Sequence, residues 1–169
     1  MTLRLILTRH AKSSWDNSNQ PDHERPLNAR GRLAATAIGE WLETRGYAPG
    51  LILCSTAIRT RETCELLNEA LAKPSPVDHV KELYHGSPEQ MIAALQDIEA
   101  KDVLIVGHNP GISTLAANLA TSPPPNERFS VYPTGATTVF DFPQDDWSEI
   151  GPGQGAVRDF VVPADLGVE

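Results

Sequence analysis

Two histidines in this sequence each directly follow an apolar run. "LILTRH" places Arg9 and His10 at the end of an expected strand, and "VLIVGH" does the same for His108. A third apolar run, "LILCS", ends at Ser55, and Arg59 follows within the next helical turn. Imidazoles supply nucleophilic and acid–base chemistry, and the guanidinium fork of arginine matches the geometry of a phosphate. These residue types therefore predict a site that holds a phosphoryl group.

The elements that must position these residues alternate between strand and helix. Short apolar runs predict strands, the third of them with a connector, at residues 3–8, 51–55, 76–84, 102–107, 135–142 and 156–163. Apolar residues at helical spacing predict helices at residues 29–45, 56–72, 88–98 and 112–119, with Asn28 as the N-cap of the first and Ser87 as the N-cap of the third. The pattern predicts one domain over residues 1–169, an α/β fold built as a three-layer α/β/α sandwich. Its central sheet is expected to be mostly parallel, with an antiparallel edge strand.

The three strand ends that carry these histidine, arginine and serine residues are expected to lie side by side. Ligands of open α/β sheets bind beyond the carboxyl ends of the strands, and the helix N-termini after Ser55 and Pro110 would add positive dipoles there. The surrounding cations disfavour a protonated imidazole, which keeps one histidine neutral enough to attack. A zinc site is the weaker alternative, because no carboxylate cluster accompanies the histidines.

Composition restricts the remaining classes of function. The net charge is −8, and no Lys/Arg cluster with interleaved aromatic residues is present, so we expect no nucleic-acid partner. No run reaches the ~18 apolar residues of a spanning helix, so we expect no membrane partner, and the first apolar run is interpreted as a strand, not a signal peptide. Cys54 and Cys64 are expected to be buried free thiols, which is consistent with a cytoplasmic location.

Four segments, in this order, resemble the histidine phosphatase superfamily, which has the phosphoglycerate mutase-like fold. They are "TRHAKS", "RPLNARG", "CSTAIRTRET" and "VGHNPG", and together they extend over most of the chain. Within that superfamily the sequence is most similar to the SixA-type phosphohistidine phosphatases. The resemblance implies a phosphatase that forms a covalent phosphohistidine and needs no cofactor or metal. Its substrate would be a phosphorylated molecule, with phosphohistidine on a protein as the favoured form.

The resemblance also implies a role for each matching residue. His10 would be the nucleophile, Arg9 and Arg59 would clamp the phosphoryl oxygens, and His108 would donate to the same group. Arg25 would add a further phosphate contact, although a salt bridge within its loop is an alternative.

Two positions depart from the family pattern or leave a role open. Ala11 stands where the family's Arg-His-Gly often has glycine, so this loop is expected to differ slightly in shape. Glu82 is the best candidate for the general acid by its order along the chain, with a surface charge or an ion-pair partner as the alternative. Ser55 is interpreted as a helix-capping or positioning residue.

Other residues receive structural interpretations. Trp15 is expected to pack in the core of a loop rather than flank the pocket, and the helical stripe with Trp41 is core rather than a cofactor site. His23, His79 and His85 are expected to be structural or exposed. Two other functions stay open: hydrolysis of small phosphoesters by the same fold, and a phosphate-binding module without catalysis.

Overall fold

A six-stranded sheet forms the centre of the computed structural model, which describes residues 2–168. Its strands are β1 (Leu3–Arg9), β2 (Leu51–Cys54), β3 (Val77–His79), β4 (Asp102–Gly107), β5 (Thr137–Phe142) and β6 (Ala156–Val161). The α-helices are α1 (Ala29–Arg45), α2 (Ile58–Glu69), α3 (Pro88–Leu95), α4 (Gly111–Leu119) and α5 (Arg128–Val131). Within the described part of the chain, no helix is long and apolar enough to cross a bilayer.

The sheet has the strand order β3-β2-β4-β1-β5-β6. The pairs β2–β3, β2–β4 and β1–β4 are parallel, whereas β5 is antiparallel to both β1 and β6. The continuously apolar β4 lies in the middle, as its sequence predicts, because helices cover both of its faces. The expected mostly parallel sheet with antiparallel pairing at one side is confirmed.

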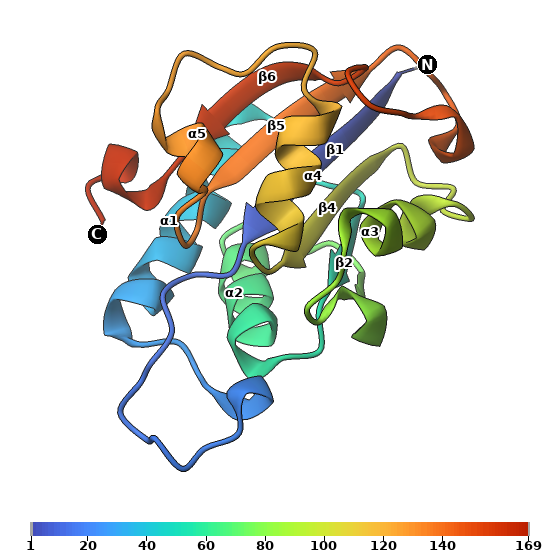
Figure 1. Cartoon of the computed structure of the whole chain (residues 1–169). Helices are drawn as coiled ribbons and strands as arrows, with labels where there is room; N and C mark the ends of the chain where they lie inside the picture. Colours follow the sequence, from blue (N-terminus) through green and yellow to red (C-terminus); the bar gives the residue numbers. More distant parts are fainter. Residues whose placement is uncertain (1, 169) are drawn as a thin grey trace.

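Helices cover the two faces of the sheet in separate layers, as Figure 1 shows. Successive strand residues point to opposite faces, so Leu5 and Leu7 pack in one core cluster with residues of α3 and α4. Ile6 and Leu104 face the other way and pack in a second cluster with residues of α1 and α2. The predicted three-layer α/β/α sandwich is thus confirmed.

Capping side chains define where α1 and α3 begin. Asn28 accepts a hydrogen bond from the Gly31 backbone N–H at the start of α1, and Ser87 forms a capping box with Gln90 at the start of α3. Both caps were predicted from sequence. Cys54 and Cys64 are free and buried, also as predicted.

The loops contain more structure than the sequence predicts. A 3-10 turn, η1 (Asp22–Glu24), lies in the polar segment after β1, and the single-turn helix α5 lies within the Pro-rich segment after α4. A second 3-10 turn, η2 (Lys81–Leu83), follows β3. These short elements have no apolar periodicity long enough to reveal them, and all three lie near the pocket described below.

Candidate active site

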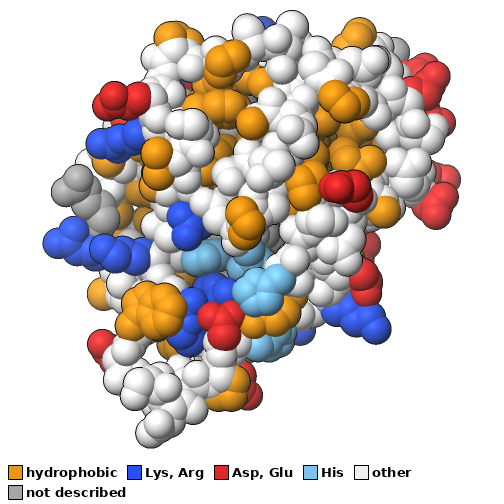
Figure 2. Space-filling model, viewed as in Figure 1, with side chains coloured by type: hydrophobic (Ala, Val, Ile, Leu, Met, Phe, Trp, Pro, Cys, Tyr) orange, Lys and Arg blue, Asp and Glu red, His pale blue; other side chains and the backbone are white. Residues whose placement is uncertain are grey.

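The carboxyl ends of β1, β2 and β4 lie side by side at one edge of the sheet. β4 pairs in parallel with β1 on one side and with β2 on the other, so the residues that follow these strands reach the same edge. A hollow of about 400 Å³ opens there, with histidine and arginine side chains gathered around it (Figure 2). Its lining brings together five of the predicted site residues: Arg9, His10, Arg25, Arg59 and His108.

His10 is held with one ring nitrogen ready to attack. Its side chain is buried, and Nδ1 lies 2.7 Å from the carbonyl oxygen of Ala11. A carbonyl can only accept, so Nδ1 carries the proton and Nε2 keeps its lone pair. Burial, with the charges of Arg59 and Arg9 adding to it and the Ala11 hydrogen bond opposing it, lowers the pKa of His10 to about 3. The imidazole is therefore neutral at pH 7.

His108 stands next to His10, with 5.3 Å between the ring centroids. Its Nδ1 lies 3.4 Å from Nη2 of Arg59, which can only donate, so Nδ1 carries the lone pair. The Nε2–H then donates to Oγ of Ser55 over 2.8 Å. Burial lowers the pKa of His108 to about 3, and electrostatic repulsion from His10 and Arg59 adds to this effect. Ser55 therefore contacts the ring of His108, and its role as a positioning residue stays a prediction.

The arginines form the positive wall of the hollow. Arg59 is buried in the first turn of α2, and Arg9 is partly buried at the end of β1, where Nη1 donates to the carbonyl oxygen of Tyr132. The Nε atoms of both arginines are buried and have no hydrogen-bond partner among the described residues. Burial, reinforced by the charge of Arg59, lowers the pKa of Arg9. Each arginine thus offers donors to an anion in the hollow.

Arg25 reaches the same hollow from the loop after β1. Its Nη1 donates to Oγ of Ser13 at 2.6 Å, and its Nε and Nη2 donate to Oδ1 of Asp22. The guanidinium lies 3.6 Å from the ring centre of Trp15, a cation–π contact. Trp15 is 75% exposed and lines the hollow, so the prediction that it packs in a loop core is wrong. The buried arginine gives this ring one face to stack on, and the other face lies in solvent.

Asp22 is a site residue that sequence reasoning missed. Its Oδ2 accepts from Nη2 of Arg59 at 3.0 Å and from the hydroxyl of Tyr84 at 2.6 Å, while Oδ1 accepts from Arg25. Burial opposes ionisation, but the hydrogen bonds from Tyr84 and Arg59 outweigh it and hold the pKa of Asp22 well below its usual range. The available signal was its place three residues before Arg25 in a loop that serves the site.

His85 also lines the hollow. The sequence predicted only that its side chain would be structural or exposed. Its ring centroid lies 5.8 Å from that of His108, and its Nε2 lies 3.5 Å from Oδ2 of Asp22. Its backbone has φ of 54°, and the next residue, Gly86, packs against Gly111 at the start of α4. A Cβ on Gly111 would lie 2.0 Å from the Gly86 carbonyl oxygen, so only glycine allows this close approach.

Glu82 is not brought into this hollow. It lies in η2, its side chain is exposed, and it lines a separate depression with Val80 and Gln90. The chain reverses between Glu82 and His85, so the imidazole faces the hollow in place of the carboxylate. The expectation that Glu82 supplies the acid of this site therefore has no support in the geometry.

Ala11 fits the place where the family often has glycine. It is fully buried, and it is not among the described non-glycine residues with positive φ. Its N–H donates to Oγ1 of Thr63 and its carbonyl accepts from His10. The loop thus keeps a shape that alanine adopts without strain, because no left-handed conformation is required.

The site has the donor set of an anion-binding centre. Across residues 2–168, no group of three or more His, Cys, Asp or Glu side chains is arranged to hold a metal ion. A neutral imidazole with a free ring nitrogen, placed among guanidinium groups at the carboxyl edge of an α/β sheet, suits nucleophilic attack on a phosphoryl group.

Comparison with known proteins agrees with this class of site. A sequence model of the Histidine phosphatase superfamily (branch 1) matches residues 5–96. An uncharacterized protein of Mycobacterium tuberculosis is 34% identical over 162 residues, which covers 92% of this chain and 99% of that protein. The chain belongs to the histidine phosphatase superfamily.

More distant relatives include SixA proteins. A crystal structure from Agrobacterium tumefaciens, described provisionally as the phosphohistidine phosphatase SixA, superposes with a TM-score of 0.77 at 28% identity. The match covers 95% of this chain and 98% of that one. Phosphohistidine phosphatase SixA of Escherichia coli is 24% identical over 127 residues, which covers 73% of this chain and 78% of that protein. The phosphoglycerate mutase-like fold predicted from sequence is thereby confirmed.

Proposed function

We propose that this protein is a metal-independent phosphatase that hydrolyses phosphohistidine on a protein through a covalent phosphohistidine on His10. The observation that carries the proposal is the buried, neutral His10, whose Nε2 lone pair lies in one hollow with Arg9 and Arg59. The similarity to SixA proteins supports the choice of substrate.

In the first step, Nε2 of His10 attacks the phosphorus atom and forms a P–N bond. The P–N bond to the substrate's imidazole breaks, and that imidazole, already protonated on its far nitrogen, takes the electron pair and leaves as a neutral molecule. Nδ1 of His10 keeps its proton and its hydrogen bond to Ala11. Arg9, Arg59 and His108 stabilise the phosphoryl oxygens during transfer.

In the second step, a water molecule attacks the phosphorus of phosphorylated His10. The P–N bond breaks, its electron pair returns to Nε2, and the product is dihydrogen phosphate, which then loses a proton according to the pH. When the phosphoryl dianion binds, Nδ1 of His108 takes up a proton from solvent and donates to a phosphoryl oxygen while Nε2–H stays with Ser55, and that proton returns to solvent when phosphate leaves. The enzyme returns to its starting protonation state.

Trapping of the intermediate tests the nucleophile. The wild-type protein, mixed with a labelled phosphodonor and quenched in base, is expected to carry label that is stable in base and lost in acid. His10→Ala is expected to carry none and to lose about 1000-fold or more of its turnover. His79→Ala is the matched control, because His79 is exposed in β3 and does not line the hollow. Undiminished label in His10→Ala would remove the nucleophile assignment.

We further propose that His85, not Glu82, carries the proton in phosphoester hydrolysis. His85 lines the hollow with its Nε2 3.5 Å from Oδ2 of Asp22, whereas Glu82 lines another depression. His85 would donate its proton to a leaving alkoxide and recover one from the attacking water. A phosphohistidine protonated on its far nitrogen needs no such donor.

Leaving-group dependence tests this role. His85→Gln is expected to lower turnover of alkyl phosphates by about 100-fold and that of an activated aryl phosphate by much less, since a good leaving group needs no acid. Glu82→Gln is the matched comparison and is expected to change neither. Equal losses for both substrates in His85→Gln would exclude proton donation, and a loss confined to Glu82→Gln would restore the carboxylate.

Hydrolysis of small phosphoesters is the second candidate function, and the placement of His85 in the hollow favours it. Turnover of a phosphohistidine protein is compared with that of a panel of sugar and alkyl phosphates. We expect a higher kcat/KM for phosphohistidine; a higher value for an ester would establish the second candidate. Phosphate binding without turnover of any donor would instead indicate a non-catalytic phosphate-binding module.

A further inference from the structure

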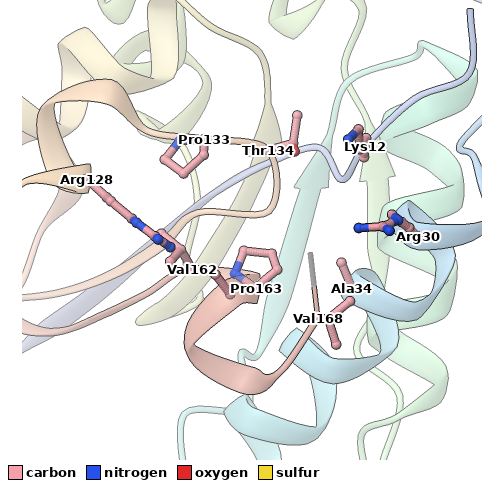
Figure 3. A pocket seen from close by; sticks show the side chains of 10 residues that line it. Lys12, Arg30, Ala34, Arg128, Pro133, Thr134, Val162, Pro163 and Val168 are labelled. Atoms are coloured by element: carbon pink, nitrogen blue, oxygen red, sulfur yellow. The ribbon is translucent and has the colours of Figure 1, made fainter.

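A second, smaller hollow adjoins the candidate active site. It measures about 170 Å³, and Lys12 and Thr134 line both hollows. Figure 3 shows Lys12, Arg30 and Arg128 around it, with the apolar side chains of Ala34 and Pro163 between them. A group bound on His10 therefore has a neighbouring space with cations around an apolar floor.

Three segments that lie far apart in the sequence supply the cations of this hollow. Lys12 follows the catalytic histidine, Arg30 lies in the first turn of α1, and Arg128 begins α5. Gly31 permits the contact between the first two segments, because a Cβ there would lie 2.0 Å from the carbonyl oxygen of Lys12. The "RPLNARG" motif thus serves both hollows: its first arginine enters the phosphoryl site, and its glycine lets α1 approach the Lys12 backbone.

Charge concentrates here against the sign of the molecule. The chain has 14 Lys and Arg residues against 22 Asp and Glu, yet among residues 2–168 no carboxylate lines the second hollow. Six of those 14 cations line the two hollows together: Arg9, Lys12, Arg25, Arg30, Arg59 and Arg128. A net charge of −8 repels anions at long range, so an anionic ligand must be selected by this local concentration of charge.

We propose that the second hollow binds an acidic side chain of the phosphorylated polypeptide, close to its phosphohistidine. A glutamate suits the shape, because its methylene groups pack on the apolar floor of Ala34 and Pro163 while its carboxylate meets Lys12 and Arg128. This inference rests on the proposed function. It adds a reason for selectivity, since a phosphohistidine without a nearby acidic residue leaves the second hollow unused.

A pair of synthetic phosphohistidine peptides tests the proposal. The two differ only in a Glu or a Gln near the phosphohistidine, and the pair is made at several spacings. Wild-type protein is expected to show a KM about tenfold lower for the Glu peptide at the best spacing, because its carboxylate gains charge pairs with Lys12 and Arg128. The kcat values are expected to be similar, because the contact is equally strong in the transition state.

Arg128→Gln is expected to reduce the preference for the Glu peptide from about tenfold to about threefold, because the charge pair with Lys12 remains. Arg128 lines only the second hollow, so this variant spares the phosphoryl site. Lys73→Gln, which removes an exposed cation outside both hollows, is the matched control and should keep the full preference. Equal KM values for the two peptides in the wild type, or a preference that is undiminished in Arg128→Gln, would overturn the inference.

The two possible failures are distinguishable. Absence of turnover of both peptides contradicts the proposed function itself, whereas equal turnover of both contradicts the second hollow alone. A further experiment compares the inhibition constants of a carboxyalkylphosphonate and of the alkylphosphonate of equal length. Tighter binding of the carboxylate compound that depends on Arg128, without any peptide preference, would assign the hollow to a small acidic substrate and overturn the polypeptide as its ligand.

Discussion

The floor and the rim of the phosphoryl hollow differ in how the fold holds them. Floor residues lie at strand ends or in the first turn of α2 and are buried, with His10 6%, Arg59 3% and His108 3% exposed. Rim residues lie on loops and turns, where the side chains of Asp22 and His85 are 43% and 60% exposed. The floor is therefore fixed by the same packing that stabilises the domain, whereas the rim can change without loss of the fold. We infer that chemistry resides in the floor and substrate choice in the rim.

Arg59→Ala should give the largest contrast between floor and rim. It removes a buried charge that contacts both Asp22 and His108, and we expect kcat/KM to fall by about 100- to 1000-fold. Arg61→Ala, two positions further along α2, is the control, because its guanidinium donates to a backbone carbonyl of Thr56 instead. Similar losses in the two variants would show that charge on α2, and not contact with the phosphoryl group, matters.

The burial of the floor histidines predicts a pH-dependent stability. The unfolded chain binds a proton on each imidazole near pH 6.5, but folded His10 and His108 do so only near pH 3, so stability falls as the pH falls between these values. Each of the two histidines should lower the free energy of unfolding by about 2 kcal/mol between pH 6.5 and 5, at about 1.4 kcal/mol per pH unit. Urea unfolding at several pH values measures this loss.

His10→Gln should remove about half of that pH dependence above pH 5, since it leaves His108 as the other buried imidazole. His79→Gln, a change at an exposed position in β3, should keep all of it. An unchanged slope in His10→Gln would mean that this imidazole does not stay neutral on folding.

Ser55→Ala tests whether the second histidine needs a positioning residue. Loss of the 2.8 Å hydrogen bond to Nε2 of His108 should lower kcat by about fivefold to tenfold, equivalent to about 1 kcal/mol, with little change in KM. Ser55→Thr should recover part of the activity if its hydroxyl reaches the ring. Ser75→Ala removes a buried hydroxyl that donates to the Pro49 carbonyl, remote from the site, and should leave kcat unchanged.

Asp22→Asn should give the smallest effect and reports on the rim. The Asp22 carboxylate occupies donors of Arg25 and Arg59, so it competes with a bound phosphate for them. We expect inorganic phosphate to bind about threefold more tightly to the variant, an effect of the size typical for exposed ion pairs. Asp16→Asn, on the same loop, is the control. Weaker phosphate binding would show instead that Asp22 mainly orients the two arginines.

The sequence was most informative where local rules apply. The apolar runs of β1, β2 and β4 and the caps at Asn28 and Ser87 follow from periodicity and hydrogen bonding within a few residues. Once these strands are parallel neighbours, the rule for their carboxyl ends places His10 and His108 in one hollow.

The rim did not follow such rules. Tyr84 and Asp22 are 62 residues apart and meet only because two loops pack together. Trp15 was misplaced because its exposed position depends on stacking with Arg25. The choice between Glu82 and His85 depends on one chain reversal after η2, which has no signature in the residue pattern.

By itself, therefore, the sequence determined the strands, the helices and the identity of the floor residues, because strand and helix periods together with the parallel topology dictate where strand ends meet. Only the tertiary structure decided which loop side chains surround that floor. A loop has no repeating geometry, so the contacts of Asp22, of His85 and of the second hollow arise from packing between segments distant in the chain.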